Sequence, residues 1–119
     1  MRHEFHCSLC NAQAGAIDLT TDRFITIDGP VGVTHFGASD VLKAKVAGIL
    51  HQPDELELAR QLYALDELWA PQYCPDCDAI YCKDHWQIEM RFEDDDDLPG
   101  WYDAAYGTCP RGHKRMIDD

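Results

Sequence analysis

Hydrophobic positions between residues 16 and 36 come in short runs separated by polar breaks. Phe24, Ile25 and Ile27 are strong β-formers, and the Asp-Gly-Pro stretch at 28–30 interrupts them before the apolar residues resume. Runs of this length, punctuated by Gly and Pro, are typical of strands joined by tight turns. The pattern predicts short β-strands in this part of the chain.

Two helices are predicted next along the chain. Ser39 or Asp40 can cap the first, and Pro53 suits the first turn of the second, where acidic residues that follow it favour the positive end of the helix dipole. Pro71 ends the second segment. Apolar residues recur at helical spacing in both: Val41, Leu42, Val46, Ile49 and Leu50, then Leu58, Leu62, Leu65 and Trp69. We expect both stripes to face a core.

The C-terminal third is less regular. Residues 87–92 can extend a strand or form a short helix, and the sequence alone does not decide between them. Residues 93–100, EDDDDLPG, are predicted to form a loop because they combine a run of charge with a Pro-Gly ending.

The chain has 119 residues, which suits one domain with a small core. Its formal net charge is −12, from 22 acidic and 10 basic residues, and no stripe of Lys and Arg is visible. Such a surface repels phosphate, so neither nucleic acid nor an anionic membrane is an expected partner. A protein partner with a basic surface suits the charge better.

Cysteine usage points to a reducing compartment. The chain has no apolar run of the ~20 residues that cross a bilayer, and its first ten residues, MRHEFHCSLC, lack the apolar core of a secretory signal. We therefore expect a cytoplasmic protein, where thiols bind metal or catalyse more often than they form disulfides.

Every cysteine belongs to a closely spaced pair of candidate metal ligands. The pairs are Cys7 with Cys10, Cys74 with Cys77, Cys82 with His85, and Cys109 with His113. Together they supply two Cys3His sets with no cysteine left over, which is the donor chemistry of tetrahedral zinc. Four protein ligands leave no position for a reactive water, so the sequence predicts two structural Zn²⁺ ions rather than a hydrolytic centre. No cysteine remains free to act as a nucleophile.

The spacing leaves two arrangements of the pairs open. The second and third pairs, which lie close together in the chain, can share one ion. Alternatively, the first and third pairs share one ion and the second and fourth pairs share the other, which brings the N-terminus against the middle of the chain.

The order of these residues resembles the cross-braced zinc fingers of the RING, FYVE and PHD families, with RING the closest in character. The resemblance rests on CSLC at 7–10, CPDCDAIYCKDH at 74–85 and Cys109-Pro110. It implies a small α+β domain with a treble-clef type, RING-like cross-brace. One zinc would be held by Cys7, Cys10, Cys82 and His85, and the other by Cys74, Cys77, Cys109 and His113.

The resemblance covers residues 1–10 and 73–115, and residues 11–72 form a folded β/α insert within a single domain, 1–119. The last pair departs from the RING pattern because it is Cys-x3-His instead of Cys-x2-Cys. A PHD-type role, in which the domain binds a methylated histone tail, is a minor alternative. It is supported only by scattered aromatic and acidic residues. Lipid binding of the FYVE type is excluded, because the segment WAPQYC before the second pair carries no basic residue.

RING fingers bind a ubiquitin-conjugating enzyme through a shallow groove, and this chain has residues at comparable positions: Leu9, Trp101, Pro110 and Lys114. The resemblance therefore implies a protein-interaction module and, more finely, a ubiquitin-ligase-type adaptor that positions its partners without a catalytic residue of its own. A non-catalytic structural or regulatory zinc module that binds a basic protein is the alternative. A redox-sensing or metal-sensing role is a third class.

Overall fold

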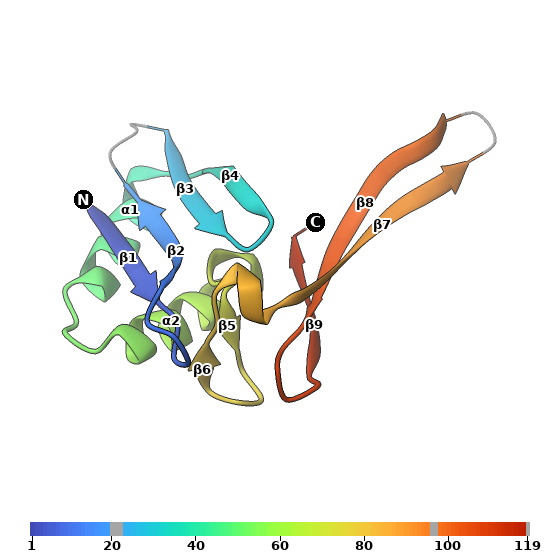
Figure 1. Cartoon of the computed structure of the whole chain (residues 1–119). Coiled ribbons are helices and arrows are strands. Elements are labelled where there is room, and N and C mark those ends of the chain that lie inside the picture. The colour runs from blue at the N-terminus through green and yellow to red at the C-terminus, as the bar shows by residue number, and fades with distance from the viewer. Residues whose placement is uncertain (20–22, 96–97, 119) are drawn as a thin grey trace.

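The computed structural model of the protein describes the backbone of residues 1–19, 23–95 and 98–118, and the side chains of these residues outside 91–103. The N-terminal part is a four-stranded antiparallel meander in the order β1-β2-β3-β4 (Figure 1). Its strands are β1 (Arg2–His6), β2 (Gln13–Asp18), β3 (Phe24–Gly29) and β4 (Gly32–Gly37). The short strands predicted between residues 16 and 36 are therefore confirmed, and β1 adds a fourth strand from the ligand-bearing N-terminus.

Two helices follow, as predicted: α1 (Asp40–Leu50) and α2 (Glu55–Leu65). Ser39 caps α1 by accepting a hydrogen bond from the backbone N–H of Leu42 at 3.2 Å. The predicted start of α2 was early, because Asp54 is the cap and Pro53 lies outside the helix. The second segment also divides in two, since an extended Asp66 ends α2 and caps the short 3-10 helix η1 (Glu67–Trp69).

The rest of the chain contains short elements and one long hairpin. A two-stranded sheet pairs β5 (Tyr73–Cys74) with β6 (Ala79–Ile80), and the 3-10 helix η2 (Lys83–His85) follows. The strands β7 (Gln87–Asp95), β8 (Leu98–Thr108) and β9 (Lys114–Asp118) form an antiparallel sheet, and β7 and β8 extend away from the other elements (Figure 1).

The loop predicted over residues 93–100 was wrong for most of its length, because β7 continues to Asp95 and β8 begins at Leu98. The ladder pairs Glu93 with Trp101 and Asp95 with Leu98. Strand pairing is made by backbone N–H and C=O groups, so a run of charged side chains does not prevent it.

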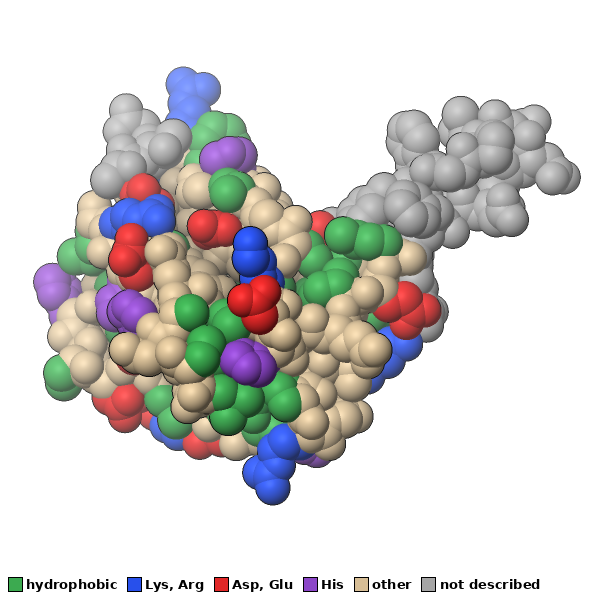
Figure 2. Space-filling view, in the orientation of Figure 1, with side chains coloured by type: hydrophobic (Ala, Val, Ile, Leu, Met, Phe, Trp, Pro, Cys, Tyr) green, Lys and Arg blue, Asp and Glu red, His purple; other side chains and the backbone are tan. Residues whose placement is uncertain are grey.

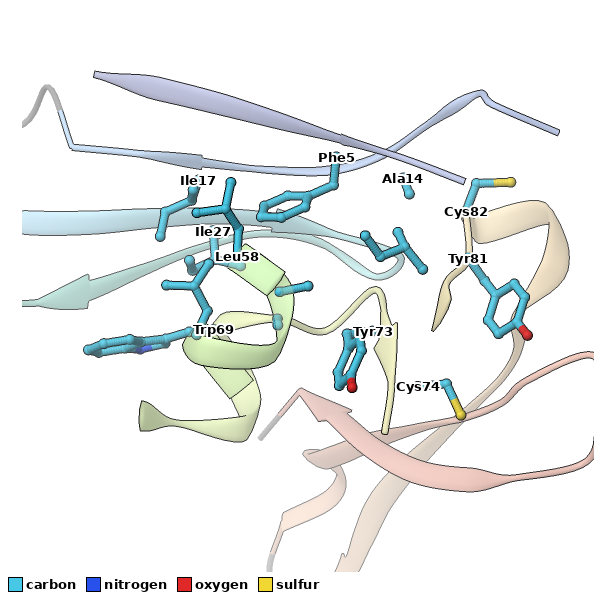
Figure 3. Close-up of a cluster of buried hydrophobic side chains, with 14 of the residues drawn as sticks. Phe5, Ala14, Ile17, Ile27, Leu58, Trp69, Tyr73, Cys74, Tyr81 and Cys82 are labelled. Atoms are coloured by element: carbon cyan, nitrogen blue, oxygen red, sulfur yellow. The ribbon is translucent and has the colours of Figure 1, made fainter. Parts of the chain in front are cut away.

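The apolar core lies between the four-stranded sheet and the helices (Figure 3). Phe5, Ile25, Leu58 and Leu62 are completely buried there. The cysteines Cys7, Cys74, Cys82 and Cys109 are also buried and belong to the same cluster. The metal-ligand candidates are thus continuous with the core.

The C-terminal sheet is attached to this core through a few defined contacts. Arg115 on β9 donates hydrogen bonds to the carbonyl oxygens of Ala70 at 2.8 Å and Tyr73 at 2.7 Å. Gly107 on β8 lies against the indole of Trp86, where an added Cβ would stand 2.8 Å from a ring carbon. Within the described ranges, no helix is long and apolar enough to cross a membrane.

Candidate metal centres

The first centre joins the loop after β1 to the short helix η2. The Cys7 Sγ atom lies 3.4 Å from His85 Nδ1, and Cys10 Sγ lies 3.7 Å from Cys82 Sγ. Cys82 Sγ lies 3.2 Å from His85 Nδ1. All four ligand atoms are within 4.8 Å of one another. We call this set centre 1.

The second centre joins the β5–β6 turn to the β8–β9 loop. The Cys77 Sγ atom lies 3.6 Å from Cys109 Sγ and 3.2 Å from His113 Nδ1. Cys74 Sγ lies 3.8 Å from the same nitrogen. These four atoms also lie within 4.8 Å of one another. We call this set centre 2.

The pairs are therefore interleaved. The first pair meets the third, and the second meets the fourth, so the structure brings together the two sets that the cross-brace resemblance implies. The other arrangement left open by the sequence, in which the second and third pairs share an ion, does not occur, although the chain runs directly from β5–β6 to η2.

Local turn geometry explains how the first, second and fourth pairs can each aim two side chains at one point. The backbone N–H of Leu9 donates to Cys7 Sγ at 3.4 Å, and the N–H of His113 donates to Cys109 Sγ at 3.4 Å. Left-handed backbone allows each loop to reverse: Asn11 has a φ of 63°, Asp78 of 52° and Gly112 of 90°. Asn, Asp and Gly are the residues that adopt this conformation most readily.

The sulfur–sulfur distances match the spacing of ligands in a zinc tetrahedron. With Zn–S bonds of ~2.3 Å and Zn–N bonds of ~2.0–2.1 Å, neighbouring ligand atoms stand ~3.5–3.8 Å apart. Sulfur–sulfur separations of 3.7 Å in centre 1 and 3.6 Å in centre 2 agree with that spacing. The residues present fit Zn²⁺ in both centres, and each centre supplies four protein ligands.

A thiol of centre 1 and a thiol of centre 2 differ in their pKa values. Burial raises the pKa of Cys7, but hydrogen bonds from nearby backbone N–H groups, that of Cys82 foremost, outweigh it and bring the pKa to about 6. In centre 2, burial raises the pKa of Cys74 to about 12, helped by the thiols of Cys77 and Cys109. Three thiolates at such separations repel one another strongly. A divalent cation relieves this repulsion, because a coordinated thiol is deprotonated.

Polar contacts around the centres were not predicted from the sequence. The Ser8 N–H donates to the Ile80 carbonyl at 2.7 Å, and the Ile80 N–H donates to Ser8 Oγ at 3.1 Å, so the centre 1 loop is fastened to β6. Beside centre 2, Asp78 accepts hydrogen bonds from Arg60 and from the Tyr73 hydroxyl, the latter at 2.6 Å. Single serine and aspartate residues carry no spacing signal that would have revealed these roles.

The predicted partner-binding residues have different surroundings. Leu9 is 59% exposed on the centre 1 loop. Pro110 is exposed on the centre 2 loop. Lys114 pairs with Glu89 at 2.8 Å and lies over the Tyr106 ring. The side chain of Trp101 lies outside the described residues.

A hollow of about 380 Å³ lies between the sheet and η2. Asp28 and Lys83 bring opposite charges to its wall, and glycines of the β2 and β3–β4 region line the rest. It contains neither a zinc ligand nor an arrangement of groups that resembles a nucleophile with its base.

Fold and sites together define a small α+β domain built around two interleaved Cys3His centres. The sequence model of one family matches residues 1–119, and the chain therefore belongs to the family described as a domain of unknown function (DUF8328). No curated protein and no solved structure matches the chain significantly. No RING, FYVE or PHD family is identified, and the likeness to them is one of ligand order.

Proposed function

We infer that this domain is a non-catalytic protein-interaction module held in shape by two structural zinc ions. The observation that carries the proposal is a rigid loop with an exposed apolar residue: Leu9 is 59% exposed between two ligands of centre 1. Both ligand sets are complete, so neither ion has a position for substrate or water. Catalysis at the zinc ions therefore does not explain why the two sites are present.

The anchoring of its neighbours makes Leu9 a suitable contact residue. Ser8 is hydrogen-bonded to Ile80 in both directions, and Cys10 is a ligand, so the backbone on each side of Leu9 is fixed. A preorganised apolar side chain loses little conformational entropy when a partner covers it. Residues of this kind often dominate the binding energy of an interface.

The finer proposal is a RING-like role, in which the module binds a ubiquitin-conjugating enzyme. Supporting it are the interleaved ligand sets, the exposed Leu9 before the second ligand, and the exposed Pro110 after the seventh. Lys114 is already paired with Glu89, which argues against a partner site that depends on the charge of Lys114 alone. The apolar contacts carry this proposal.

The test uses the zinc-loaded chain and a panel of ubiquitin-conjugating enzymes, each charged with ubiquitin. We expect one enzyme to bind and to discharge its ubiquitin faster, and Leu9→Ala to weaken binding by about tenfold or more. Val41→Ala is the matched control, because Val41 is an apolar residue 82% exposed on α1. Zinc content should be unchanged in both variants. Binding that ignores Leu9→Ala, or no binding across the panel, overturns the RING-like role.

The alternative partner is a basic protein surface, and the net charge of −12 favours it. On the face shown in Figure 2, Lys and Arg side chains are dispersed among acidic and apolar ones instead of forming a stripe. Association driven by charge weakens steeply as salt is added, whereas apolar contact through Leu9 does not. The salt dependence of binding therefore distinguishes the two kinds of partner.

A further inference from the structure

The two edges of the four-stranded sheet differ in how they are protected. The β1 edge carries the charged residues Arg2 and Glu4 and has a register shift between Phe5 and His6. The His6 N–H donates to the Glu55 carboxylate at 3.0 Å. Charges, irregularities and side-chain contacts of this kind prevent an edge strand from pairing with another chain.

The β4 edge has none of these devices. Its sequence, Gly-Val-Thr-His-Phe-Gly, contains no charged residue and no proline, and its ladder with β3 has no register shift. Among the described residues, no backbone hydrogen bond joins residues 32–37 to an element other than β3. Val33 is 59% exposed. β4 is thus a regular, uncharged and open edge.

The register identifies the backbone groups that point outward. Gly29 pairs with Gly32 across the two-residue turn at 30–31, and such a closing pair is hydrogen-bonded. Hydrogen-bonded pairs alternate along an antiparallel ladder, so Thr34 and Phe36 bond to β3. The N–H and C=O groups of Val33, His35 and Gly37 consequently face away from the sheet. These three are also the exposed residues of β4 after Gly32.

We propose that the β4 edge accepts an extended, basic segment of a partner protein as an added strand. This rests on the proposed function as an interaction module and names its surface. An added antiparallel strand satisfies the outward groups of Val33, His35 and Gly37 through main-chain hydrogen bonds, and side chains on alternate positions supply selectivity.

Charge selects a basic segment over a second copy of this chain. Two chains that each carry −12 repel one another when their edges approach. Asp28 lies directly opposite Val33 in the ladder, so its side chain is on the same face as that of Val33. Among the described residues, Asp28 forms no ion pair. A Lys or Arg on the added strand can reach over Val33 to this carboxylate.

The experiment selects binders to the zinc-loaded chain from a displayed library of random peptides of about twelve residues, enough to cover the strand with flanks. Selected peptides are then titrated against Val33→Lys and Val33→Pro. Val33→Lys keeps the outward backbone N–H group but adds a positive charge that repels a basic strand. Val33→Pro removes this N–H group, which forms no hydrogen bond with β3. If Val33→Pro does not fold, Val33→Lys alone decides. Val41→Lys is the control, because it adds the same charge at another exposed valine, on α1.

We expect the library to yield β-forming peptides rich in Lys and Arg that bind Val33→Lys at least about tenfold more weakly, with Val41→Lys unaffected. Amide hydrogens of Val33, His35 and Gly37 should become protected from exchange when the peptide binds. Peptides whose binding is unaffected by Val33→Lys but abolished by Leu9→Ala overturn the edge proposal. They still support the proposed function as an interaction module. The proposal is equally overturned by a failure to select any peptide, or by a dimer of the free chain that Val33→Lys dissolves.

Discussion

Two parts of this protein are stabilised by different means. They are the N-terminal body, which comprises β1 to β4 with α1 and α2, and the C-terminal sheet, which comprises β7 to β9. Strands β1 to β3 and the helices α1 and α2 contribute most of the large side chains that are fully buried: Phe5, Ile17, Ile25, Val46, Leu58 and Leu62. In the described part of β7 to β9, only Ile117 belongs to that group. The N-terminal body therefore has an apolar core of its own, whereas the described side chains of the sheet include a single large, fully buried one, that of Ile117.

Centre 2 links the C-terminal sheet to the rest of the molecule through its ligands. It fixes the β8–β9 loop to the β5–β6 turn, and Arg115 and Trp86 add a few further contacts. Metal binding contributes free energy to folding without requiring buried apolar area. The contribution of each centre to stability should therefore depend on the other contacts between the two chain segments that it joins. Centre 1 reinforces β1, which already packs through the buried Phe5, whereas centre 2 holds a sheet in which Ile117 is the one large, fully buried side chain among those described.

The largest expected effect is the loss of one zinc centre. Wild-type protein should contain two zinc ions by native mass spectrometry, and Cys77→Ala and Cys10→Ala should contain one each. Structural zinc is worth on the order of 10 kcal/mol, so both variants are strongly destabilised. Cys77→Ala should abolish hydrogen-exchange protection throughout β8 and β9, because centre 2 holds them. Cys10→Ala should expose mainly the residues around the first and third ligand pairs.

The same hydrogen-exchange pattern in Cys77→Ala and Cys10→Ala would contradict the conclusion that the two centres stabilise different parts of the molecule. Protection of β8 and β9 that survives in Cys77→Ala would show that the sheet is stable through its own strand pairing. A wild-type chain that binds a single zinc ion would refute the assignment of eight ligands to two centres.

A smaller effect is expected from a core substitution in the body. Leu62 on α2 is fully buried, and Leu62→Ala leaves a cavity that costs about 2–5 kcal/mol. Both zinc ions should remain, since Leu62→Ala leaves all eight ligands in place. Urea denaturation of the zinc-loaded protein measures the loss, with Val41→Ala as the exposed control. Zinc release caused by Leu62→Ala would show that the centres depend on the packing of the core that they adjoin.

Sequence reasoning predicted the parts of this architecture that local chemistry determines. Ligand spacing revealed the Cys3His sets because every cysteine has a ligand-type neighbour. Helical periodicity and capping by Ser39 placed α1, and β-forming residues placed β3. The interleaved pairing required a resemblance to known zinc fingers, because spacing alone left the second and third pairs free to share an ion.

The remaining features depend on partners far away in the chain. The register of β7 with β8 depends on backbone pairing that the acidic run at residues 93–97 does not disclose. Arg115 reaches carbonyl groups more than forty residues away in sequence, at Ala70 and Tyr73. The open β4 edge emerges only from the sheet order, which places β4 at its end.

The smallest expected effect comes from the ion pair that joins the body to centre 2. Arg60 on α2 donates to both carboxylate oxygens of Asp78, at 2.9 and 2.6 Å, and Asp78 follows the ligand Cys77. The side chains of Arg60 and Asp78 are 43% and 45% exposed, and ion pairs in such exposed positions contribute little to stability. Arg60→Ala should shift the urea midpoint by an amount close to the limit of resolution, and added salt should reduce it further.

The pH dependence of this shift has a definite sign. The Arg60 hydrogen bonds, followed by that of Tyr73, lower the pKa of Asp78 to about 2 from an ordinary 3.8. A carboxyl with a depressed folded-state pKa stabilises the protein above its ordinary pKa and loses that contribution as the pH falls toward the folded value. The difference between wild type and Arg60→Ala should therefore be constant from about pH 8 to 5 and shrink below about pH 4. Zinc content must be followed at each pH, because acid also protonates the ligands. A difference that grows as the pH falls would show that Arg60 acts through something other than the Asp78 carboxylate.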